Sequence, residues 1–128
     1  RAIDKEDPYQ IHGSEQTRAF CFIKDAIRAT AELSLKNENG IFHIGNDEEE
    51  VPIINLAEKV VDYFGYKPYF DIRDAPQGSV QRRCPDISKI KKLLNFVPEY
   101  RLDEGLRETI DWYTEYYKNN ISFRSEFS

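Results

Sequence analysis

Apolar residues recur at helical spacing in several stretches of the chain, and the segment 53–64 shows this pattern most clearly. Its apolar positions fall at i, i+3, i+4, i+7, i+8 and i+11: Ile53, Leu56, Ala57, Val60, Val61 and Phe64. This spacing predicts an amphipathic helix, because such positions share one face of a 3.6-residue repeat. Gly65 follows immediately and suits the left-handed residue that ends many helices.

Three further helices are predicted from the same kind of pattern. Ile23, Ile27, Ala31 and Leu35 repeat every four residues, which predicts a helix over 25–36 with Asp25 as its N-cap. Asp86 is placed to cap a short helix over 87–94. The positions of Leu102, Leu106, Ile110, Tyr113 and Tyr117 predict a long closing helix over 102–117, with Trp112 beside its apolar stripe.

Short extended runs alternate with these helices, at 9–12, 20–23, 41–44 and 68–72. Strands that alternate with helices favour an α/β arrangement. The runs are too short and too few for an independent doubly wound sheet, so the apolar helix faces are expected to cover something else, such as an upstream domain. The acidic run 48–50 is expected to be a solvated loop that complements the dipole of the following helix.

Size and charge narrow the classes of function. The 128 residues fit one domain or a piece of one, and 40% hydrophobic with 32% charged residues is typical of a globular protein. A net charge of −5 argues against nucleic acid as the main partner. No apolar run is long enough for a membrane span. Cys21 and Cys84 are expected to be reduced thiols, and no His or Cys pair has the spacing of a metal site.

Arginines in two distant stretches are the best candidates for binding chemistry. Arg18 lies in Gln16-Thr17-Arg18, and Arg82 and Arg83 open the stretch Arg-Arg-Cys-Pro-Asp. Guanidinium groups hold phosphate oxygens in a bidentate manner, so a pair of them suits a pyrophosphate. The sequence has no glycine-rich dinucleotide loop, which indicates that the chain carries only part of a site.

Several motifs in a fixed order resemble one family. They are Ile-x-Gly before Gln-Thr-Arg-x-Phe-x-x-Ile-x-Asp, then Gly-Ile-Phe-His-Ile-Gly-Asn, then Arg-Arg-Cys-Pro-Asp-Ile-Ser-Lys, then Leu-x-Glu-Gly-Leu-x-x-Thr-Ile-Asp-Trp-Tyr. The chain is similar over 11–117 to the C-terminal part of NAD-dependent epimerases and dehydratases, extended short-chain dehydrogenases that act on nucleotide sugars. UDP-glucuronate decarboxylases and dTDP-glucose 4,6-dehydratases resemble it most.

This resemblance implies a fold and a set of binding residues. The fold would be a small mixed α/β substrate-binding portion that lacks the Rossmann domain, over 1–118, with a frayed tail at 119–128. Arg18 and Arg83 would grip the nucleotide pyrophosphate, with Arg82 as an offset alternative, and Gln16 would border the nucleotide. No catalytic, cofactor-binding or metal-binding residue is assigned, because the catalytic groups of the family lie upstream.

The resemblance also implies partners. The full-length enzyme would use NAD, while this chain alone would bind none. Its partners would be a nucleotide-diphosphate sugar, an upstream Rossmann domain of the same polypeptide and a second subunit of a homodimer, in the cytoplasm, in carbohydrate metabolism such as cell-surface polysaccharide biosynthesis. The absence of Met and the first residue, Arg1, agree with a segment of a larger protein. The alternative is a free-standing, non-catalytic binding or oligomerisation module related to that family.

Overall fold

The computed structural model describes residues 1–36 and 38–125, and their elements alternate between strands and helices as expected. The helices are α1 (Ile23–Ser34), α2 (Ile53–Tyr63), α3 (Ser88–Leu94) and α4 (Leu102–Ser125). The strands are β1 (Tyr9–His12), β2 (Thr17–Ala19), β3 (Glu50–Pro52), β4 (Phe70–Arg73) and β5 (Arg82–Arg83). The fold is a small mixed α/β arrangement.

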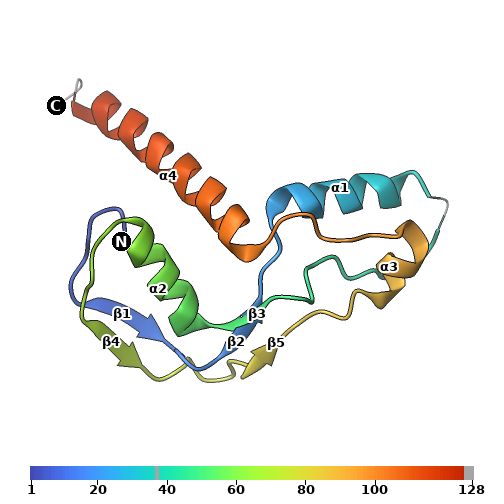
Figure 1. The fold of residues 1–128 in the computed structure, drawn as a ribbon, viewed down its shortest axis with the longest axis horizontal. Coiled ribbons are helices and arrows are strands. Elements are labelled where there is room, and N and C mark those ends of the chain that lie inside the picture. The colour runs from blue at the N-terminus through green and yellow to red at the C-terminus, as the bar shows by residue number, and fades with distance from the viewer. Residues whose placement is uncertain (37, 126–128) are drawn as a thin grey trace.

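The strands form two small sheets. In the first sheet, β1 pairs with β4 in parallel. In the second, β2 lies in the centre, antiparallel to β3 on one side and parallel to β5 on the other. Figure 1 shows this second sheet in the middle of an elongated molecule, between two groups of helices.

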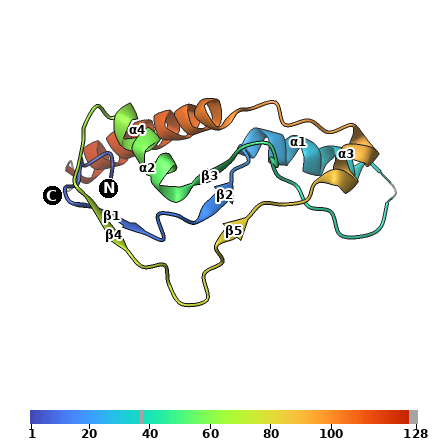
Figure 2. The ribbon, with the colours of Figure 1, turned by 60° about the horizontal axis from the view of Figure 1, so that its bottom comes forward.

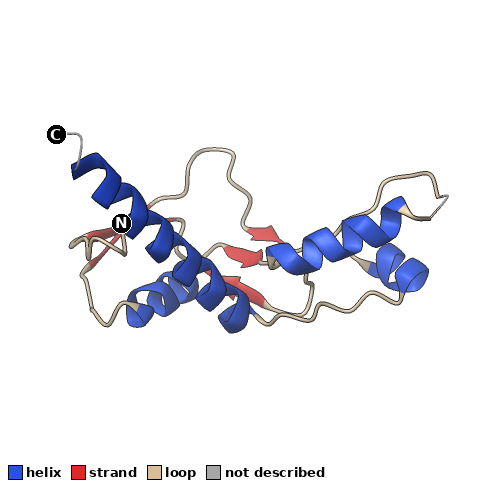
Figure 3. Cartoon of the chain, turned by 90° about the horizontal axis from the view of Figure 1, so that it is seen from above, coloured by secondary structure: helices blue, strands red, loops and turns tan. Residues whose placement is uncertain are grey.

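The helix groups lie at opposite ends of the molecule. At one end α1 and α3 lie side by side, as Figure 3 shows from above. Between them lies a buried cluster of Ala29, Ile87, Ile90 and Phe96, against which Leu33, Ile44 and Leu94 pack. At the other end α2 packs on α4 and on β1. Figure 2 shows the loop between β4 and β5 reaching away from the helices.

The predicted strand at 41–44 is not a strand in the structure. Exposed Ile41 and His43 alternate with half-buried Phe42 and Ile44, as in a strand, but within the described residues this backbone forms no ladder with another segment. A strand needs a neighbour that satisfies its N–H and C=O groups. The 20–23 run is likewise irregular up to the start of α1, and the ladder falls on 17–19 instead.

Asp25 does not cap α1, contrary to expectation. The helix begins two residues earlier, after Phe22, and Asp25 lies in its first turn with 1% of its surface exposed. Its carboxylate accepts hydrogen bonds from the backbone N–H groups of Glu99 and Tyr100 and from Arg28. Asp25 therefore ties α1 to the loop before α4.

The predicted apolar stripe of α1 faces outward. Ile23, Ile27 and Leu35 are 59%, 60% and 86% exposed, whereas Ala29 on the opposite side is fully buried against α3. The four-residue repeat therefore marks a face that the described residues do not cover. The stripe of α2 is partly buried instead, with Val61 3% exposed.

The closing helix is longer than the sequence indicated, because α4 continues through 119–125, a stretch that was expected to fray. Residues 126–128 of that expected tail lie outside the described residues. None of the described helices is long and apolar enough to cross a membrane.

Candidate functional site

The central sheet brings the two predicted arginine stretches together. Arg18 in β2 is paired with Arg83 in β5, and Thr17 is paired with Arg82. Residues that are directly paired in a ladder project from the same face of the sheet, and successive residues project from opposite faces. Arg18 and Arg83 therefore share one face, and Arg82 lies on the other.

Arg82 is neutralised on its own face. Its Nε and Nη2 atoms donate to Glu50 Oε2 at 2.9 and 2.6 Å, and Thr17 Oγ1 donates to Glu50 Oε1. These hydrogen bonds, from Thr17 and then from Arg82, hold the pKa of the Glu50 carboxyl below its usual range. Arg82 therefore already has a carboxylate partner. The acidic run is more than a solvated loop, because Glu49 also accepts from Leu102 N–H at the start of α4.

The face with Arg18 and Arg83 carries uncompensated positive charge. Arg18 Nη1 donates to the backbone oxygens of Thr17 and Gln81 at 2.7 and 3.4 Å, and Nη2 donates to Gln16 Oε1 at 2.9 Å. All three acceptors are neutral. Exposed Arg83 has neither an ion pair nor a side-chain hydrogen bond to any residue that the structure describes. Neighbouring guanidiniums without a carboxylate can bind a compact anion.

Gln16 is buried, with 7% of its surface exposed. Besides the bond from Arg18, its Oε1 accepts a hydrogen bond from Ser79 Oγ at 3.2 Å, while its Nε2 donates to none of the described residues. Gly13 allows this packing, since a Cβ there would lie 2.9 Å from Gln16 Cδ and the glycine has φ +61°. Gln16 thus links Arg18 to the loop between β4 and β5.

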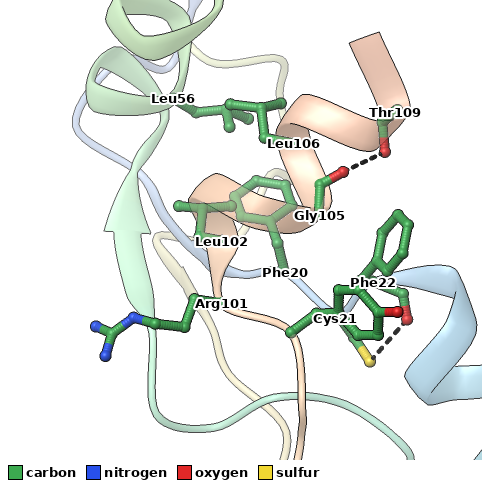
Figure 4. A pocket seen from close by; sticks show the side chains of 10 residues that line it. Phe20, Cys21, Phe22, Leu56, Arg101, Leu102, Gly105, Leu106 and Thr109 are labelled. Carbon is green, nitrogen blue, oxygen red and sulfur yellow. Dashed lines mark hydrogen bonds between the residues drawn. The ribbon is translucent and has the colours of Figure 1, made fainter. Parts of the chain in front are cut away.

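An apolar cavity of about 190 Å³ lies elsewhere, between the end of β2, α2 and the start of α4. Figure 4 shows Phe20, Leu56, Leu102 and Leu106 around it, with the Arg101 side chain directed away. Burial raises the pKa of the Cys21 thiol in its wall, with a further contribution from the Asp25 charge. A raised pKa makes a thiol less reactive, and most of the side chains that line this cavity are apolar, so it offers packing surface.

Lys91 on α3 forms ion pairs with Asp47 at 2.7 Å and Glu48 at 3.7 Å. Among the described residues, no group of three or more His, Cys, Asp or Glu could hold a metal ion. The sequence did not reveal the Gln16–Ser79 contact, because only the folded chain brings these residues together.

Known proteins that resemble the chain are nucleotide-sugar enzymes, although no family model matches it. UDP-glucuronic acid decarboxylase 1 of Danio rerio is 32% identical over 114 residues, which cover 86% of this chain and 27% of that protein. UDP-N-acetyl-alpha-D-glucosaminuronate decarboxylase of Bacillus cytotoxicus is 30% identical, over 90% of this chain and 38% of that protein. The chain thus spans well under half the length of these relatives.

A solved structure gives the same result. UDP-glucuronic acid 4-epimerase of Bacillus cereus, solved in complex with UDP-glucuronic acid and NAD, superposes with a TM-score of 0.72. It is 28% identical, and the match covers 82% of this chain and 34% of the epimerase. The fold is therefore the small mixed α/β portion of an extended short-chain dehydrogenase. More specifically, the chain is related to the NAD-dependent epimerases, dehydratases and decarboxylases of nucleotide sugars and matches their C-terminal part.

Proposed function

We propose that this chain is the nucleotide-sugar-binding portion of an NAD-dependent sugar-nucleotide epimerase, dehydratase or decarboxylase, in which Arg18 and Arg83 anchor the substrate diphosphate. The observation that carries the proposal is the β2–β5 register, which pairs these arginines on one face, where neither forms an ion pair with any described residue. A nucleoside diphosphate brings about two negative charges that must be neutralised on burial. Arg82, held by Glu50, is left out of this pair of anchoring residues.

The anchoring contacts would lie far from the reacting carbon. Binding energy from a remote phosphate can orient the sugar ring at the reaction centre, which raises the rate of the chemical step. In the full-length enzyme, NAD would supply the hydride-transfer chemistry. This chain would contribute position alone, and no turnover is expected from it by itself.

The residues of this chain do not fit NAD. A dinucleotide cradle needs a glycine-rich turn between a strand and a helix, so that backbone N–H groups approach the pyrophosphate. Here Phe22 and Pro52 precede α1 and α2, and neither helix start contains glycine. We assign NAD binding to an upstream Rossmann domain of the full-length cytoplasmic enzyme.

The open apolar face of α1 supports such a partner domain. Ile23 and Ile27 are exposed there, and the unpaired extended segment 41–44 follows α1 in the chain with Ile41 83% exposed. An apolar helix face and an unpaired strand are both features that a neighbouring domain would cover. The same surface would support the alternative of a free-standing module if it closed against a second copy, and a homodimer is part of either proposal.

Arg18→Ala is the direct test of the anchor. Adding UDP to the chain while recording its NMR spectrum should shift the signals around β2 and β5. Losing one charge-assisted phosphate contact costs about 1.5–3 kcal/mol, so Arg18→Ala should weaken UDP binding roughly 10- to 150-fold. Arg83→Ala should weaken it comparably.

Arg107→Ala is the matched control, because Arg107 is an exposed arginine on α4. Lys91 would be unsuitable as a control, because it forms ion pairs with Asp47 and Glu48. Arg82→Ala should also reduce UDP affinity less than Arg18→Ala does. If Arg18→Ala and Arg107→Ala change UDP affinity equally little, the anchor is disproved.

A further inference from the structure

The Gln16 amide has only one orientation that satisfies its neighbours. Arg18 can only donate hydrogen bonds, so the atom 2.9 Å from its Nη2 must be the amide oxygen. Ser79 Oγ, at 3.2 Å, can donate to the same oxygen. The guanidinium is therefore held by an acceptor that is itself fixed from the β4–β5 loop.

The acceptor that holds Arg18 differs in one respect from the acceptor that holds Arg82. Arg82 is held by the Glu50 carboxylate, which fixes the guanidinium and cancels its charge. Arg18 is held by a carboxamide and two backbone carbonyls, which fix it and leave its charge intact. A carboxylate could replace the Gln16 oxygen geometrically, yet it would neutralise the group that should meet the anion.

We propose that Gln16 is a charge-neutral positioning residue, which orients the Arg18 guanidinium while leaving its positive charge available for a phosphate group. This inference rests on the proposed function, because it assigns Gln16 a role only if Arg18 binds an anion. Gln16 acts through Arg18, and its burial together with the close approach of Gly13 keeps the amide in place.

The variants Gln16→Glu and Gln16→Met separate positioning from simple support of the fold. Glu keeps acceptor oxygens for Arg18 and Ser79 but adds a negative charge, whereas Met keeps the volume, removes the acceptor and stays neutral. Pyrophosphate binding to the 128-residue chain is measured by NMR at constant ionic strength. We expect Gln16→Met to weaken pyrophosphate binding several-fold. Gln16→Glu should weaken it by about tenfold or more, because that is the effect of losing one charge-assisted contact.

A purely structural role predicts the reverse order: Gln16→Met should bind pyrophosphate more weakly than Gln16→Glu, because Met loses both hydrogen bonds. That order would overturn the inference. Gln77→Glu in the exposed β4–β5 loop adds the same charge and should change affinity by less than about twofold, since exposed charges are strongly screened. Binding that falls equally in Gln77→Glu and Gln16→Glu would mean that net charge alone acts.

The double variant Gln16→Met with Arg18→Ala distinguishes failure of the inference from failure of the proposed function. If Gln16 acts through Arg18, adding the neutral Gln16→Met to Arg18→Ala should change pyrophosphate affinity little, since residues that share one interaction are not additive. A full additional loss would overturn the positioning role while leaving Arg18 as an anchor. If Arg18→Ala alone binds pyrophosphate like the unmodified chain, the anchor itself is wrong.

Discussion

At the scale of single residues, Arg82 and Arg83 show how neighbouring side chains of one type take different roles. They are adjacent in sequence, and the alternation of the strand sends them to opposite faces of the sheet. Glu50 meets one of them at 2.6 Å, and the other has no acidic partner among the described residues. Charge in the environment, and not residue type, therefore separates the structural arginine from the candidate ligand-binding arginine.

Asp25 is the residue whose replacement should destabilise the chain most clearly. It is 1% exposed and accepts from two backbone N–H groups and from Arg28. Asp25→Asn keeps the shape but loses the charge and places an NH2 group against donors, so unfolding free energy should fall by about 2–4 kcal/mol. Urea unfolding measures this change. Asp103→Asn, at an exposed ion pair with Lys59, should change it by under about 1 kcal/mol.

The same carboxylate makes stability depend on pH. Burial alone would raise the pKa of Asp25, but hydrogen bonds from Tyr100, Arg28 and Glu99 outweigh burial and lower it. A carboxyl with a lowered folded-state pKa stabilises the fold above its unfolded pKa of about 3.9 and loses that contribution as pH falls below it. Between about pH 6 and pH 3 the unmodified chain should therefore lose more stability than Asp25→Asn. Equal losses in both proteins would contradict the assigned role.

At the scale of elements, α1 is the helix whose apolar stripe the described residues leave open. Exposed apolar patches promote association, so the chain should form dimers or larger species at high concentration. Ile27→Glu should shift it towards monomer, because Ile27 is 60% exposed in the centre of that face. Light scattering at millimolar concentration measures this. Tyr69→Glu, at a 73% exposed site away from α1, is the control.

A monomer at that concentration in the unmodified chain, with a thermal midpoint well above the roughly 45–65 °C of ordinary domains, would indicate a self-sufficient module. A second exposed apolar surface lies on α4. Although α4 packs on α2 and buries Ile110, its residues Trp112, Tyr113, Tyr116 and Tyr117 are 43–59% exposed.

Helices were easier to predict than strands and site pairings. The stripe at 53–64 gave α2 to within a residue, because helical periodicity is local. Strand β3 was missed, since a three-residue strand next to an acidic run has no local signal and is defined by its partner β2. The choice between Arg82 and Arg83 was likewise open, because it depends on a register between segments distant in sequence. The sequence also did not predict which face of α1 is buried, because that depends on the packing of Ala29 against residues distant in sequence.

At the scale of the whole molecule, the chain should not bind NAD by itself. The described helices offer no glycine-rich start for a dinucleotide pyrophosphate. At the start of α3, the Ser88 N–H already donates to the Asp86 carboxylate. Calorimetric titration with NAD should show no binding tighter than about 100 μM, which is roughly −5.5 kcal/mol. Tighter binding would refute the assignment of the cofactor to another domain. UDP serves as the positive comparison under the same conditions.

The two adjacent arginines in β5 make the binding face insensitive to a one-residue shift in the register of that strand. If β5 slipped by one residue against β2, Arg82 and Arg83 would exchange faces, and the face of Arg18 would still receive a guanidinium. Strand β2 has no such redundancy, because Thr17 and Ala19 flank its single arginine. The same slip in β2 would remove Arg18 from that face. Strand β2 is paired on both sides, with β3 and with β5. The strand that carries only one arginine is therefore the one whose register is set by two neighbouring strands.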